Sequence, residues 1–201
     1  MYGTRAQEPL AAASVKLDGV PVVWIQADLA APLTPWFDHR DAFMRMLHVG
    51  GDLPLRAAVP GYTVREVDVA EELPLVATLL RASSGVAARG MDDVLAWARR
   101  SVFHPHAWLW AVDRTTKRPV GLAIADVDSE TQEASLVCLE VLPDHRDRGV
   151  GTMLLQELIG RLERMAAFTT ATLPLRSGTH PDHLFSACGF SGHAIWWRLR
   201  R

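Results

Sequence analysis

The chain has 201 residues, of which 49% are hydrophobic, so it is long enough to enclose one full core with a small appendage. Its 21 basic and 23 acidic residues leave a net charge of −2, which gives no electrostatic reason to expect nucleic-acid binding. No stretch approaches the roughly 18 apolar residues of a membrane span, and the N-terminus does not resemble a signal peptide, so we expect a cytoplasmic protein.

The first 59 residues predict an N-terminal extension that begins with a β-hairpin. Asp18 and Gly19 are a hairpin-turn signal between β-branched residues. Pro21 favours an edge position for the second strand, because proline has no N–H group to donate to a neighbouring strand.

A helix is predicted to follow this hairpin. Thr34 is its expected N-cap and Pro35 its first residue, and the glycines at 50–51 end it. Its apolar stripe consists of residues at helical spacing, namely Trp36, Phe37, Phe43, Met44 and Leu47. We expect the extension, residues 1–59, to pack on the main domain, residues 60–201, or on a second subunit, which makes a homodimer a candidate assembly.

The main domain predicts the element order β-α-α-β-β-β-α-β-α-β. Asp68 is the expected N-cap of the first helix with Glu71 as its capping-box partner, and a polar turn at 113–118 joins two strands in a hairpin. The tight hairpin favours an α/β (α+β) fold with a mixed, mostly antiparallel central sheet flanked by helices. The expected strands are 62–69, 108–112, 120–126, 134–141, 168–175 and 194–199, and the later helices are 91–101, 150–166 and 183–188.

Cysteine and histidine usage indicates no metal site. Cys138 and Cys188 lie in predicted core segments, which favours buried, reduced thiols over a reactive thiol. The eight histidines form no HExxH pattern, and there is no paired-cysteine motif.

The segment with the clearest chemistry runs from Leu139 to Leu155. A buried strand leads into a short polar loop with two glycines, Gly149 and Gly151, and a helix begins at once. Backbone N–H groups at a helix N-terminus favour an anion, and glycine allows a phosphate to approach the backbone. Arginines at 146 and 148 add positive charge, so the residues predict a phosphate or pyrophosphate site. The alternative is a loop-to-helix turn that needs glycine only for its dihedral angles.

The spacing Arg146-x-x-Gly149-x-Gly151 resembles the acyl-CoA-binding motif Gln/Arg-x-x-Gly-x-Gly/Ala of the GNAT superfamily of N-acetyltransferases. The segment from Leu184 to Phe190 resembles the short helix ending in Gly-Phe near the C-terminus of that family. The strand that begins at Tyr62, with the helix after it, is similar to the family's first strand and helix. The resemblance covers about residues 60–201.

The resemblance implies that acetyl-CoA, or another acyl-CoA, is a co-substrate and that no metal is needed. The pantetheine arm would lie along the strand as an added β-strand, and the pyrophosphate would lie on backbone N–H groups of the loop. The acceptor, a primary amine of a small molecule or peptide, would attack the thioester directly in a ternary complex. The implied cofactor-binding residues are Leu139, Val141, Arg146, Arg148, Gly149, Val150, Gly151 and Thr152.

The catalytic residues are open at this point. Many relatives use a tyrosine where this sequence has Phe185. His180 and His183 are the candidate replacements, because histidine titrates in the useful range, although both also fit a structural role at a short helix. Glu140 is a candidate general base within the central strand and faces opposite to its two strand neighbours; a partnered structural carboxylate is the alternative. His104 and His106 lie at the expected edge of the cleft as weaker candidates.

Two functions from different classes fit these residues. An N-acetyltransferase accounts for the intact loop motif. A non-catalytic acyl-CoA-binding sensor or interaction module of the same fold accounts for the absent tyrosine and for the N-terminal extension.

Overall fold

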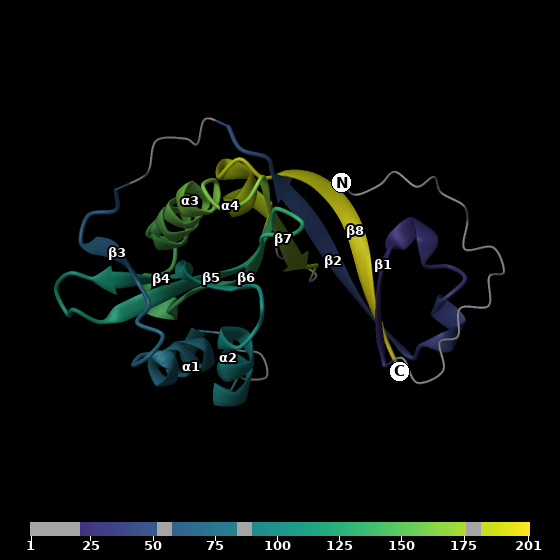
Figure 1. The fold of residues 1–201 in the computed structure, drawn as a ribbon, viewed down its shortest axis with the longest axis horizontal. Coiled ribbons are helices and arrows are strands. Elements are labelled where there is room, and N and C mark those ends of the chain that lie inside the picture. Colours follow the sequence, from purple (N-terminus) through teal and green to yellow (C-terminus); the bar gives the residue numbers. More distant parts are fainter. Residues whose placement is uncertain (1–20, 52–57, 84–89, 176–181) are drawn as a thin grey trace. The chain divides into compact units, whose positions relative to one another are not determined.

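A computed structural model of the chain describes residues 21–51, 58–83, 90–175 and 182–201 (Figure 1). These residues form two compact units, with the boundaries after 46, 171, 182 and 191. The larger unit holds the described residues among 47–171 and 183–191, and the smaller unit holds those at 21–46, 172–182 and 192–201. The expected division at residue 59/60 stays a prediction.

The larger unit contains a mixed sheet with helices on both faces. Its strands follow one another in the order β7-β6-β5-β4-β3, and only the pair β6 and β7 is parallel. The strands are β3 (Tyr62–Glu66), β4 (Phe103–Asp113), β5 (Pro119–Asp128), β6 (Glu133–Val141) and the first part of β7 (Phe168–Pro174), which continues into the smaller unit. This arrangement confirms the predicted mixed, mostly antiparallel sheet.

Two hydrophobic clusters fix the helices to the sheet. On one face lie α1 (Leu73–Ser83) and α2 (Met91–Ala98), and their apolar sides pack on Trp108, Trp110 and Leu122 of the strands. On the other face lies α3 (Val150–Leu162), whose buried leucines pack on small and apolar strand residues. Figure 1 shows α3 on one side of the sheet and the pair α1 and α2 on the other, with α4 (Asp182–Ala187) beside α3.

The predicted hairpin in the larger unit is confirmed, and one helix cap differs from the prediction. Strands β4 and β5 pair antiparallel around the turn, where Asp113 N–H donates to Arg118 O. At the start of α1 the carboxylate that accepts from the Asp68 N–H is Glu72, not Glu71. The reason is an extra turn at 68–72, in which the Glu72 N–H itself donates to Asp68 O, so that the regular helix begins only at Leu73.

The smaller unit contains the strands β1 (Val22–Gln26), β8 (Ser191–Arg200) and β2 (His39–His48), in the order β1-β8-β2. A small core holds the turns at 27–36 against this sheet, and it includes Ile25, Leu33 and Leu199. Strand β1 begins directly after Pro21 and pairs with β8, as an edge strand that starts with proline should. The predicted hairpin turn at Asp18 and Gly19 lies outside the described residues.

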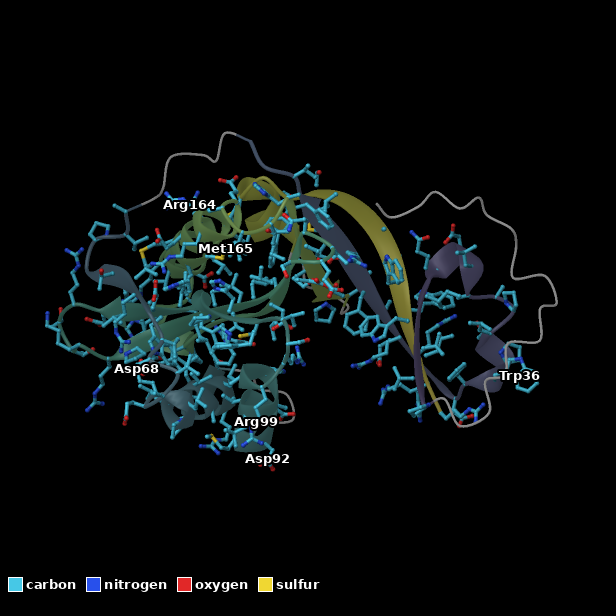
Figure 2. All side chains as sticks on the ribbon, viewed as in Figure 1. Trp36, Asp68, Asp92, Arg99, Arg164 and Met165 are labelled. Atoms are coloured by element: carbon cyan, nitrogen blue, oxygen red, sulfur yellow. The ribbon has the colours of Figure 1, made fainter. Side chains whose placement is uncertain are left out.

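The predicted helix over 34–50 is wrong, because the chain forms β2 there. Only a short 3-10 turn, Thr34–Trp36, forms, and Phe37 already has extended dihedral angles. Thr34 is not its N-cap: its hydroxyl donates to Ala30 O. Partners far along the chain decide the outcome, since Ala42 O accepts from the Leu175 N–H. Trp36, expected on an apolar stripe, is 61% exposed (Figure 2).

Neither cysteine forms a disulfide and both are buried, which confirms the prediction of buried thiols. Among the helices of the described segments, none is long and apolar enough to cross a membrane.

Candidate functional site

The N-terminal end of α3 presents backbone N–H groups for which the described residues provide no acceptor. After β6 the chain makes a 3-10 turn, Pro143–His145, and Gly149 then precedes the helix with φ +80°. The first helical hydrogen bond runs from the Met153 N–H to Gly149 O, 3.0 Å. Within the described part of the chain, the N–H groups at 150–152 find no acceptor. Together with the helix dipole, these N–H groups form a site that favours an anion.

The two glycines of this loop are there for different reasons. Gly149 has a left-handed backbone, which side chains other than glycine adopt at a cost. Gly151 lies in the first turn of α3, where an added Cβ atom would be 3.1 Å from Leu184 Cδ1 and 3.8 Å from Val141 Cγ2. The first glycine therefore shapes the turn, and the second allows α3 to approach α4 and the end of β6.

Strand β6 separates from β7 halfway along its length. The two strands pair from Glu133–Phe168 to Leu136–Ala171, and β6 then continues to Val141 without β7. On its other side β6 remains paired with β5 up to Val141. The separation begins at a β-bulge, since Leu136 and Cys138 oppose adjacent residues of β5 and residue 137 is the extra one. At residues 137–141 β6 has no pairing with β7, and this part of the strand, called the open edge below, leads to the N-terminus of α3.

The bulge sets which face of β6 each predicted residue occupies. Leu139 and Val141 join the hydrophobic cluster under α3. Glu140 opposes Leu122, which belongs to the cluster under α1 and α2, so Glu140 faces that side. This confirms that Glu140 faces opposite to its two neighbours.

The loop residues predicted to bind cofactor differ in what they present. The side chain of Val150 is only 1% exposed, so a ligand would meet its backbone alone. Arg148 is exposed and Thr152 is half-buried. The guanidinium of Arg146 instead donates from Nε to Val141 O, 3.0 Å, and from Nη2 to Ser83 O, 2.6 Å. Two of its three nitrogens are thus already engaged with the protein.

A second contact fixes the loop from the side of β3. The Tyr62 hydroxyl and His145 Nδ1 lie 2.9 Å apart, and the two rings meet edge to face. Tyr62 is buried, and His145 ends the 3-10 turn before the loop. No sequence pattern indicates this pair, because 83 residues separate its members.

The second motif, residues 184–190, contributes to a small aromatic core and provides no proton donor at the position of the family's tyrosine. Phe185, where the family's tyrosine would stand, is buried and packs edge to face on Phe190, with ring centroids 5.4 Å apart. Phe190 in turn packs against His48, a buried histidine whose pKa is lowered by desolvation. Of the predicted histidines, His183 is exposed on α4 and His180 lies outside the described residues.

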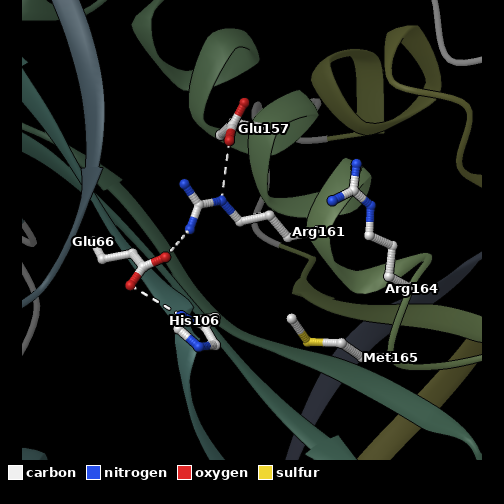
Figure 3. Close-up of a pocket in the computed structure, with 7 residues that line it drawn as sticks. Glu66, His106, Glu157, Arg161, Arg164 and Met165 are labelled. Carbon is white, nitrogen blue, oxygen red and sulfur yellow. Dashed lines mark hydrogen bonds and ion pairs between the residues drawn. The ribbon is translucent and has the colours of Figure 1, made fainter.

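One pocket of the larger unit, away from the loop, contains a network of paired charges. A pocket of about 360 Å³ lies over the C-terminal half of α3 (Figure 3). In it Glu66 accepts from Arg161 and lies 3.0 Å from His106 Nδ1, and Glu157 binds Arg161 as well. Along the axis of α3, Arg161 lies about 16 Å from the first residue of the helix, because an α-helix rises 1.5 Å per residue. His106, one of the two weaker candidates, therefore belongs to this network and not to the loop. The ring of His104, the other weaker candidate, contacts the ring of His106.

Comparison with known families matches residues 75–190, more than half of the chain, to the acetyltransferase (GNAT) family. The chain belongs to the GNAT acetyltransferase family. The match begins in α1 and ends at Phe190, so both motifs of this GNAT chain lie inside it. Among curated proteins, no sequence match was found.

Solved structures show the same GNAT fold at low sequence identity. A GCN5-related N-acetyltransferase from Sphaerobacter thermophilus is 17% identical with a TM-score of 0.72, and the alignment covers 90% of this chain and 60% of that one. A GCN5-related N-acetyltransferase from Kribbella flavida is 15% identical with a TM-score of 0.61, over 89% and 67%. The ribosomal-protein-S18-alanine N-acetyltransferase from Escherichia coli is 20% identical with a TM-score of 0.52, over 69% and 93%. This GNAT chain thus spans less than two thirds of the Sphaerobacter protein.

Proposed function

We propose that this GNAT protein is an acetyl-CoA- or acyl-CoA-dependent N-acetyltransferase that acts on a primary amine of a small molecule or peptide. The observation that carries the proposal is the continuity of two features. The open edge of β6 at residues 137–141 leads directly to the N–H groups at 150–152, which have no acceptor among the described residues. An extended thioester arm that ends in a pyrophosphate has this succession of a strand-like part and an anionic part.

The residues fit such a co-substrate in a specific way. Leu139 and Val141 would flank the pantetheine arm, and the N–H groups of Gly151 and Thr152 would bind the pyrophosphate oxygens. Exposed Arg148 would add charge to the same group. Glycine at 149 and 151 leaves the backbone accessible.

The reaction is a single displacement that needs no covalent intermediate on the protein. The neutral amine nitrogen attacks the thioester carbonyl carbon, the new C–N bond forms, and the C–S bond breaks. One proton leaves the amine, and one proton is taken up by the departing thiolate, so the products are an amide and the free thiol. Buried Cys188 has no part in this reaction, because burial raises its thiol pKa to about 11.

Glu140, His183 and His180 remain the proposed proton-transfer residues. Glu140 stands on the open part of β6 and faces the side of α1 and α2, where an acceptor amine would enter. His183 is exposed near the first residues of α3, since its neighbour Leu184 contacts Gly151. Phe185 offers no proton, which leaves the role of acid to a histidine in this proposal.

A non-catalytic acyl-CoA-binding module of the same fold is the second candidate. The observation that favours it is the buried Phe185–Phe190 contact at the position of the family's tyrosine. Such a module would keep the loop and the open strand edge but would not transfer the acyl group.

Turnover separates the two candidates. Acetyl-CoA is incubated with a panel of small-molecule and peptide amines, release of the free thiol is followed, and the amide product is identified by mass spectrometry. The transferase proposal predicts amide formation that falls at least about tenfold in Glu140→Gln and is unchanged in Glu130→Gln, an exposed carboxylate in the β5–β6 turn. Binding of acetyl-CoA without amide formation on any amine would contradict it and support the binding module.

A further inference from the structure

We propose that Arg146 is a positioning residue that couples the acyl-CoA loop to the C-terminal end of α1. This inference rests on the proposed function, because it assigns the loop to acyl-CoA and the α1 side to the acceptor. It differs from the sequence-based expectation, in which the guanidinium of Arg146 binds the pyrophosphate.

The contacts of Arg146 join three segments at one guanidinium group. Its backbone belongs to the loop between β6 and α3, its Nε donates to the last carbonyl of β6 at Val141, and its Nη2 donates to Ser83 O. Ser83 is the last residue of α1 and lies 63 positions earlier in the chain. The 2.6 Å contact to Ser83 is shorter than the 3.0 Å contact to Val141, and it is partly buried.

The chemistry of a helix C-terminus makes this contact strong. The last carbonyls of an α-helix have no partner within the helix and carry the negative end of its dipole. A guanidinium placed there supplies both a hydrogen bond and a positive charge. Ser83 is only 4% exposed, so water has little access to replace the arginine at its carbonyl.

The same contact places α1 under the control of the cofactor loop. Val141 O is the last carbonyl on the open edge of β6, where the proposed thioester arm would lie. An acyl-CoA that orders this edge and the loop therefore also orders Arg146, and through it the end of α1. Arg164, just past the C-terminal end of α3, is exposed, has no assigned part in cofactor binding, and its guanidinium makes no hydrogen bond within the described segments (Figure 3), so it provides a matched control of equal charge.

Hydrogen–deuterium exchange tests the coupling with acetyl-CoA as the probe. The wild type, Arg146→Gln and Arg164→Gln are compared with and without acetyl-CoA at saturating occupancy, which is measured by calorimetry. Without ligand, peptides covering 73–83 should exchange about tenfold faster in Arg146→Gln and at the wild-type rate in Arg164→Gln. With acetyl-CoA, exchange of these peptides should slow in the wild type and in Arg164→Gln but not in Arg146→Gln.

Two results would overturn the inference. One is wild-type exchange of peptides 73–83 in ligand-free Arg146→Gln, and the other is full protection by acetyl-CoA in that variant. If Arg146→Gln does not fold, Arg146→Lys is used; its single nitrogen reaches one carbonyl only, so an intermediate effect is expected. A wild type that binds no acetyl-CoA refutes the proposed function, whereas the ligand-free comparison still decides whether Arg146 holds α1.

Discussion

Gly151 in the first turn of α3 lies directly against Leu184 of α4, so that a Cβ atom at position 151 would be 3.1 Å from Leu184 Cδ1. The contact brings together the two sequence motifs that are 33 positions apart. It explains why a small residue is needed at 151 even without a ligand. It also places the loop beside the short helix α4.

The size of residue 151 should decide how well α3 and α4 pack. Gly151→Ala should leave the free energy of unfolding within about 1 kcal/mol of the wild type, because better helix propensity offsets a small movement of the Leu184 side chain. Gly151→Val should destabilise by about 1–3 kcal/mol, because its branched side chain cannot be accommodated by the same movement. Urea unfolding measures both values. Equal stability of the two variants would show that the close contact is absent.

The left-handed backbone of Gly149 predicts a different pattern of tolerance. At φ +80° an alanine is strained, and Gly149→Ala should lose roughly 1–2 kcal/mol of unfolding free energy. Gly149→Asn should lose less, because asparagine visits this conformation more readily. Steric clash contributes little, since the added Cβ atom would be 3.4 Å from Val59 Cγ2. Urea unfolding with alanine no worse than asparagine would contradict this conformation.

The ionised side chain of Glu72 should stabilise the fold in a pH-dependent way. Its hydrogen bonds from Arg65 above all, and from the Asp68 N–H and Trp110 Nε1, lower its pKa from 4.5 to about 2. Because the unfolded chain takes up the proton first, this stabilisation is complete above the ordinary pKa and is lost as the pH falls towards 2.

Comparison with Glu72→Gln measures this contribution, since glutamine keeps an oxygen for the buried indole of Trp110. The variant should be less stable than the wild type by roughly 1–2 kcal/mol at pH 7. The difference should shrink steadily between pH 5 and pH 2. A difference that is independent of pH over this range would mean that the charge of Glu72 has no role.

Thiol reactivity tests whether either cysteine is available for chemistry. Burial raises the pKa of Cys188 to about 11, and Cys138 is buried as well. At pH 8 both thiols of the folded protein should react slowly with a disulfide reagent, and both should react at once in urea. Rapid labelling of one thiol in the folded protein would restore the interpretation of a reactive cysteine.

The elements that the sequence predicted well are those whose pattern is local. The period of α3, the apolar run of β6 and the polar turn between β4 and β5 each identify an element without knowledge of its neighbours. Strand β2 lies where the sequence predicts a helix, because Phe43, Met44 and Leu47 also fit helical spacing. Its identity depends on partners more than 130 residues away, such as Leu175 just after β7, and no local pattern contains that information.

The candidate site likewise has features that are local in sequence, which could be predicted, and long-range contacts, which could not. The motif alone predicts the glycine-containing loop and the helix N-terminus after it, since both depend on the local chain. The role of Arg146 was not predictable, because its partner Ser83 is brought near only by the packing of α1 on the sheet. The Tyr62–His145 contact is long-range for the same reason.

Calorimetric titration of acetyl-CoA tests the central claim most directly. The wild type should bind in the micromolar range, and Gly149→Glu should not, because it places a negative charge where the pyrophosphate would lie. Gly50→Glu is the control, since Gly50 has a similar positive φ, open surroundings and no place in the loop. It should fold and bind like the wild type. A wild type that binds neither acetyl-CoA nor a longer acyl-CoA, or a folded Gly149→Glu that binds equally well, would contradict the assignment of this loop to acyl-CoA.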